Sequence, residues 1–216
     1  MFEIIKKYKT TNSVKDFIGK NYNHKIAIIG QDPSITTKNN KLINTVLMLD
    51  DKNSRLYQYI SIEILGPLNL SVDEIIAFNL IPIQLSSSIL KITQQHKIDF
   101  YSFVYRLAEY YYPTFLQKLS KYQAEYIISL GKPVFEFLKR KGNLKIGAIK
   151  EVFAQSFPIY FNKRKFILIP CVHYNSRFRM PYDTQKEKLK QITILKLGYF
   201  DILNSLFQKD FSKNEI

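Results

Sequence analysis

The stretch Lys25-Ile-Ala-Ile-Ile-Gly-Gln-Asp-Pro33 is the most informative part of the chain. Its apolar run predicts a short buried strand, whose carboxyl end is where open α/β folds bind ligands. Gly30 lets a ligand approach the backbone, Gln31 offers a donor and an acceptor, and Pro33 restricts the turn. We therefore interpret Asp32 as a rigidly held carboxylate at a pocket mouth. An ordinary strand-to-turn ending is the alternative, because turns favour the same residue types.

Apolar runs and helical spacing alternate along the rest of the chain. Strand-like runs occupy residues 25–29, 45–49, 75–81, 126–130 and 166–172, and helical spacing occupies 13–18, 55–65, 100–119, 133–139 and 184–207. This alternation predicts an α/β fold, a three-layer α/β/α arrangement with a central, mainly parallel sheet. A hairpin turning at Asn162 and Lys163 is expected to add an antiparallel strand. The length fits a single domain over residues 1–216.

The charge of the chain favours a nucleic-acid partner. Lys and Arg total 32 against 18 Asp and Glu, which gives a formal charge of +14 and a pI near 9.6. Such a balance is typical of phosphate binders. A lysine-rich, solvated surface without a specific partner is the alternative, and phosphate contacts would not reveal which bases are read.

Cysteine and histidine usage restricts the location and the cofactors. Cys171 is the only cysteine, so an internal disulfide and an iron–sulfur cluster are both excluded. His24, His96 and His173 are widely separated, and we expect neither a metal nor another cofactor. No apolar run approaches the ~20 residues that span a bilayer, and the N-terminus lacks the apolar core of a signal peptide. We expect an intracellular, cytoplasmic monomer without membrane contact.

Three segments resemble motifs of the uracil-DNA glycosylase superfamily, in the order that this family uses. Gly30-Gln31-Asp32-Pro33 resembles its first catalytic motif. The segment 75–82 resembles its middle strand, which ends at a base-reading asparagine, here Asn79. The segment 166–176 resembles the late strand that presents a histidine to the leaving base, here His173. Residues 126–131 are similar to its penultimate strand and glycine turn, so the resemblance covers about residues 25 to 180.

The resemblance implies a monofunctional DNA glycosylase that acts on duplex or single-stranded DNA. Such an enzyme flips out uracil or a damaged or modified pyrimidine and hydrolyses its N-glycosidic bond, leaving an abasic site for DNA repair. Asp32 would stabilise the sugar cation and orient water, and His173 would donate to base oxygen O2. The base-binding residues would be Gly30, Gln31, Pro33, Ser34 and Asn79. Asn79 can also cap a turn, and His173 can also hold its loop by hydrogen bonds.

The chain departs from the best-known branch of this family after Pro33. That branch has a tyrosine and a histidine where this chain has Ser34 and Ile35, and the tyrosine shields the pocket against substituents on pyrimidine carbon 5. A second hypothesis is therefore an antiviral glycosylase that excises a bulky 5-modified cytosine, such as glucosylated hydroxymethylcytosine, from phage DNA. The branch also stacks a phenylalanine on the base, whereas the candidates here are Leu47, Met48 and Tyr57.

The loop after His173 combines cations with an aromatic side chain. Arg177 and Arg179 are candidate phosphate contacts, and Ser176 resembles the phosphate-contacting serine of the family. Phe178 is either a wedge that fills the gap left by the flipped base or a buried anchor of the loop. Two other classes of function stay open: a catalytically silent DNA-binding member of the family, and a hydrolase of free nucleosides or nucleotides.

Overall fold

The computed structural model describes residues 1–22, 25–33, 45–174 and 182–192. The strands are β1 Lys9–Ser13, β2 Phe17–Ile18, β3 Ile26–Gly30, β4 Ile75–Asn79, β5 Ile83–Leu85, β6 Tyr126–Leu130, β7 Phe157–Phe161 and β8 Arg164–Cys171. The α-helices are α1 Phe2–Tyr8, α2 Arg55–Tyr59, α3 Ile89–Gln95, α4 Phe100–Lys121, α5 Lys132–Lys141, α6 Ile149–Val152 and α7 Tyr182–Gln191. The shorter helical segments are η1 Val46–Met48, η2 Ile60–Leu65, η3 Gly66–Leu68 and η4 Val72–Glu74, of which η2 is a π-helix.

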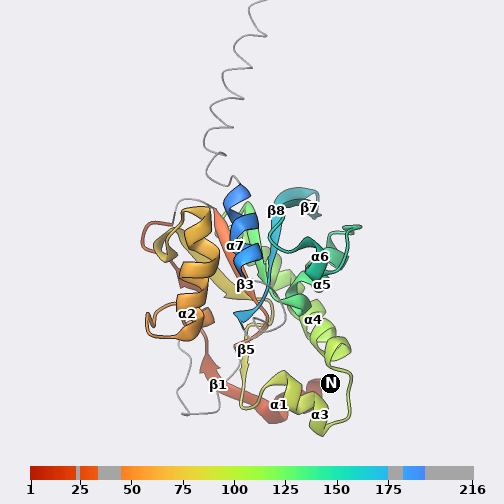
Figure 1. Ribbon diagram of the computed structural model, residues 1–216. Coiled ribbons are helices and arrows are strands. Elements are labelled where there is room, and N and C mark those ends of the chain that lie inside the picture. Colours follow the sequence, from red (N-terminus) through yellow and green to blue (C-terminus); the bar gives the residue numbers. More distant parts are fainter. Residues whose placement is uncertain (23–24, 34–44, 175–181, 193–216) are drawn as a thin grey trace, which may run out of the picture.

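The described chain forms a mixed α/β fold with a mostly parallel central sheet flanked by helices (Figure 1). The strand order is β2-β4-β3-β6-β8-β7, in which the four inner strands are parallel and the two outer strands are antiparallel to their neighbours. Strands β1 and β5 form a separate antiparallel pair. The predicted fold class is therefore confirmed at this level, and the arrangement is compatible with three layers.

The inner strands are apolar because both of their faces are covered. Every residue of β3 and β4 is buried. Phe78 of β4 packs on Phe115 of α4, with ring centroids 5.8 Å apart. The apolar runs around residues 26 to 30 and 75 to 79 thus form the centre of the core. Polar residues stand at their carboxyl ends, Asn79 at the end of β4 and Asp32 shortly after β3.

Two predicted elements are wrong. Residues 45–49 form no strand, because Leu47 and Met48 have φ values of 57° and 52°, which belong to the left-handed region. Residues 13–18 form no helix, because Phe17 instead pairs with Ala77 and extends the sheet at the edge of β4. Both patterns, of five and six residues, were too short for local sequence preference to determine the structure, and packing against the sheet determines it instead.

The other expected elements agree with the structure where it describes them. The hairpin is β7 and β8, and its turn residues Asn162 and Lys163 both have positive φ, as a two-residue type I′ turn requires. Helix α7 covers the beginning of the predicted 184–207 helix, whose residues from 193 onward lie outside the described residues. Within the described ranges, no helix combines the length and apolar character needed to cross a membrane.

Candidate active site

The carboxyl ends of the parallel strands bring together the polar residues that the sequence singled out. Gly30 pairs with Asn79 across β3 and β4, and the chain stays alongside because Leu80 N–H donates to the Gly30 carbonyl at 2.9 Å. Asp32 and His173 each follow the last residue of their strand by two positions. Only β6 separates β3 from β8, and because neighbouring strands lie about 4.8 Å apart, these two chain segments are about 10 Å apart.

A glycine occupies the space between the two catalytic candidates. Strand β6 ends at Leu130, and Gly131 follows with φ 84° and ψ 166°, a conformation that is essentially restricted to glycine. A Cβ atom on Gly131 would lie 3.2 Å from Cβ of His173. The absence of a side chain at Gly131 therefore lets this turn pack closely against His173.

Asp32 is held by its neighbours in a poorly solvated position. Gln31 Nε2 donates a hydrogen bond of 2.5 Å to Asp32 Oδ1, and the following Pro33 is buried. Burial raises the pKa of Asp32 to about 6, and the hydrogen bond from Gln31 opposes that rise. Asp32 nevertheless keeps part of its surface accessible, so a ligand can reach it. The carboxylate is oriented, poorly solvated and ionised at pH 7 to 8, as a stabiliser of positive charge needs to be.

Asn79 carries a buried amide oxygen without a partner. The residue is 3% exposed, and its Oδ1 has no hydrogen-bond partner within the part of the chain that the structure describes. The oxygen lies against Gly30, where an added Cβ would be only 2.3 Å from it and 2.8 Å from Leu47 Cδ2. Because buried polar atoms are nearly always hydrogen-bonded, this oxygen, which has no partner among the described residues, makes Asn79 a candidate ligand-binding residue, although neighbouring atoms enclose the oxygen in this structure.

His173 is neutral at pH 7. Desolvation lowers the pKa of its imidazole below the ordinary value of 6.5. Its ring lies 4.9 Å from the ring of Tyr174, at an angle of 51°. A neutral imidazole has one N–H, which can donate a hydrogen bond to a developing anion.

Several predicted site residues lie outside the described residues: Ser34, Ser176, Arg177, Phe178 and Arg179. Of the three candidates for stacking on a base, Leu47 is the one that the structure places beside Gly30. Its left-handed φ of 57° turns the chain there, a feature that no sequence pattern indicated.

Gln84 is a polar residue of interest that the sequence did not indicate. It belongs to β5, is 1% exposed, and neither amide atom has a hydrogen-bond partner among the described residues. It follows Asn79 by five residues. The segment between them lies beside the end of β3, because Ile81 N–H donates a hydrogen bond of 2.8 Å to the Gln31 carbonyl. Among the described residues, one short segment thus holds three buried amide atoms without a partner, namely Asn79 Oδ1 and both polar side-chain atoms of Gln84.

Gln84→Met is expected to raise the free energy of unfolding by about 1–3 kcal/mol, because it removes a buried amide that has no hydrogen-bond partner among the described residues. Urea denaturation measures this. Gln185→Met is the control and should lower stability, since Gln185 accepts a bond of 2.8 Å from Val172 N–H and donates one of 3.0 Å to Tyr59. Equal destabilisation by both changes would contradict the prediction.

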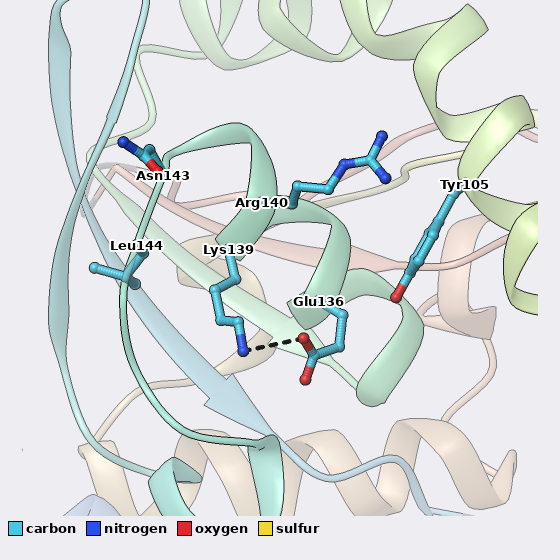
Figure 2. Close-up of a pocket in the computed structure, with 6 residues that line it drawn as sticks. All are labelled: Tyr105, Glu136, Lys139, Arg140, Asn143 and Leu144. Carbon is cyan, nitrogen blue, oxygen red and sulfur yellow. Dashed lines mark ion pairs between the residues drawn. The ribbon is translucent and has the colours of Figure 1, made fainter.

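A separate hollow lies at the far end of α5 from Gly131 (Figure 2). It has a volume of about 360 Å³ and is lined by Tyr105, Glu136, Lys139, Arg140, Asn143 and Leu144. Its cations are already paired: Lys139 with Glu136 at 3.1 Å and Arg140 with Glu109 at 3.0 Å. Its shape is shallow and its charges are satisfied, so we place the candidate site at the strand ends instead.

Among the described residues, no group of three or more His, Cys, Asp or Glu side chains is arranged to hold a metal ion. A comparison with protein-family models finds no match, and a comparison with curated proteins finds none either.

Proposed function

We propose that this protein is a DNA glycosylase of the uracil-DNA glycosylase type, which excises a flipped-out pyrimidine. One observation carries the proposal: the carboxyl ends of three parallel strands of one sheet hold an oriented carboxylate, a buried amide oxygen without a partner among the described residues, and a neutral histidine. These are Asp32, Asn79 and His173, the same three residues that the motif resemblance assigns to the sugar, the base edge and the leaving group.

The chemistry needs two opposite charges to be stabilised at the same time. The bond between sugar C1′ and the base nitrogen breaks and leaves its electron pair on the base, while a water oxygen bonds to C1′. The sugar becomes cationic during this step, and the Asp32 carboxylate stabilises it and accepts the proton that the water loses. His173 donates to O2 of the departing base, which then takes a proton from solvent.

Asn79 and Gly30 suit the recognition of the base. The lack of a side chain at Gly30 leaves space for the Asn79 amide, because an added Cβ would lie 2.3 Å from Asn79 Oδ1. The amide oxygen can accept from a base N–H, and the amide as a whole can serve cytosine or uracil, depending on its orientation. Leu47 offers an apolar contact on the same side. The formal charge of +14 supports a polyanionic substrate rather than a free nucleoside.

The decisive experiment measures abasic sites on matched oligonucleotides, both duplex and single-stranded. Each holds one uracil, thymine, cytosine, 5-hydroxymethylcytosine or glucosylated hydroxymethylcytosine, and alkaline cleavage reports base loss. We expect abasic sites from one of these substrates, and loss of that signal with Asp32→Asn.

The substrate that reacts identifies the biological role. Uracil alone would indicate repair, and a bulky 5-substituted cytosine alone would indicate action on modified phage DNA. Tight, salt-sensitive binding without cleavage of any oligonucleotide would overturn the proposal and favour a silent DNA-binding protein.

A further inference from the structure

Val172, the residue just before His173, is held by two side chains from distant parts of the chain. Its N–H donates to Gln185 Oε1 at 2.8 Å, and its carbonyl accepts from the Tyr59 hydroxyl at 2.6 Å. Gln185 Nε2 in turn donates to the Tyr59 oxygen at 3.0 Å. Val172 is 3% exposed, Tyr59 8% and Gln185 0%, so the three bonds form a closed, buried ring of polar contacts.

The hydrogen bonds of this ring begin where the backbone hydrogen bonds of the sheet end. Strand β8 stops at Cys171, whose carbonyl still accepts from Gly131 N–H at 2.8 Å. One residue later, both backbone groups of Val172 are buried and need partners, since an unpaired buried peptide group costs about as much as a lost hydrogen bond. The two side chains supply those partners and extend the order of β8 to the residue that precedes His173.

Tyr59 contacts the chain on both sides of His173. Its hydroxyl binds Val172, and its ring lies 6.4 Å from the ring of Tyr174, which lies 4.9 Å from the ring of His173. The two supporting elements are tied to each other as well, because Lys186 of α7 forms an ion pair of 3.2 Å with Glu63 of η2.

We infer that Tyr59 and Gln185 are positioning residues, which fix the backbone at Val172 and thereby aim the His173 imidazole at the reacting base. The catalytic part of this inference rests on the proposed function, whereas the structural part does not. Neither residue touches the substrate, so both act through His173. A small misplacement of a reacting group is enough to lower a rate by as much as ~10²-fold.

The test compares Tyr59→Phe with Tyr22→Phe. Tyr22 donates a hydrogen bond of the same 2.6 Å length to a backbone carbonyl, that of Tyr122, and it precedes β3 at the opposite end of the strand. Both variants lose one bond to a backbone carbonyl, and Tyr59→Phe also loses the bond from Gln185 Nε2. Of the two, only Tyr59→Phe should disturb His173. We expect kcat for base excision to fall on the order of 10–100-fold in Tyr59→Phe with KM nearly unchanged, and both constants to remain near wild type in Tyr22→Phe.

Nuclear magnetic resonance of the histidine rings tests the structural part of the inference separately from the catalytic part. The chain has three histidines, and His173→Gln identifies the signals of His173. These signals should shift in Tyr59→Phe and in Gln185→Met but not in Tyr22→Phe, at temperatures well below each melting point. Should one of the two variants fail to fold, the other carries the test.

The outcomes are distinct. Unchanged His173 signals in both variants, or equal kcat in Tyr59→Phe and Tyr22→Phe of an active enzyme, would overturn the inference. Shifted signals in a protein that excises no base would support the positioning of His173 while the proposed glycosylase function fails.

Discussion

Asp32→Asn is expected to lower the rate of base excision by about 10²–10³-fold, because it removes the negative charge that the proposed mechanism uses to stabilise the sugar cation, while it keeps the shape of the side chain. Asparagine Oδ1 can still accept the bond that Gln31 Nε2 donates to Asp32, so the loop should stay in place. Single-turnover kinetics on the oligonucleotide that reacts measure the effect. Asp73→Asn is the control, because Asp73 is exposed and precedes β4, at the amino end of the sheet.

The same substitution should stabilise the protein in neutral and alkaline solution. The folded pKa of Asp32 is raised from 3.8 to about 6, so the folded state binds the proton more tightly than the unfolded state does. Wild-type stability therefore falls as the pH rises through this interval, by up to ~3 kcal/mol at about 1.4 kcal/mol per pH unit. At pH 4 most of this cost is absent, because the folded carboxyl is protonated and the unfolded one, with its pKa of 3.8, is about half protonated.

Urea denaturation at pH 4 and pH 8 tests this sign. Asp32→Asn should match wild type at pH 4 and exceed it at pH 8, whereas Asp73→Asn should give no such pH-dependent gain. A gain in stability combined with a loss of activity is the pattern expected of a functional residue kept in an unfavourable place. A variant that loses activity and stability together at pH 8 would instead indicate a structural carboxylate.

The four inner strands of the sheet could be predicted from the sequence, because each depends on a local pattern of residues. Strands β3, β4, β6 and β8 are continuous apolar runs because they are buried on both faces, and such runs can be recognised one at a time. Their parallel arrangement then places Asp32, Asn79 and His173 at one edge of the sheet. The positions of these residues at the ends of their strands could therefore be predicted without any knowledge of the side-chain contacts.

The remaining features depend on contacts between distant residues. Tyr59 binds Val172 across 113 positions and Gln185 across 126, and no periodicity encodes such a pair. The unpartnered amide of Gln84 is likewise visible only once its surroundings are known. Leu47 was expected in a strand, but its backbone has a left-handed conformation and its side chain packs beside Gly30. Sequence patterns thus indicated the candidate site residues at the strand ends but not the side chains that hold them.

Gly30→Ala is expected to weaken recognition of the base while the fold survives. The new methyl group would lie 2.3 Å from Asn79 Oδ1 and 2.8 Å from Leu47 Cδ2, distances that atoms cannot maintain. Both atoms are ends of side chains, so the Asn79 amide must rotate away, at a cost in stability of about 1–3 kcal/mol. Base-excision kinetics should show kcat/KM falling at least about tenfold, as expected when an amide that reads a base is lost.

A double-mutant cycle shows whether the effect passes through Asn79. In an Asn79→Ala background the amide oxygen is gone, so adding Gly30→Ala should cost far less activity than it costs in wild type, which is the non-additivity expected of residues in contact. Gly66→Ala serves as the control, because Gly66 has helical φ and ψ and its added Cβ would approach nothing closer than 3.3 Å. Full additivity of the two site substitutions would mean that Gly30 and Asn79 act separately. The effect of Gly30→Ala would then have to come from the approach of its methyl group to Leu47.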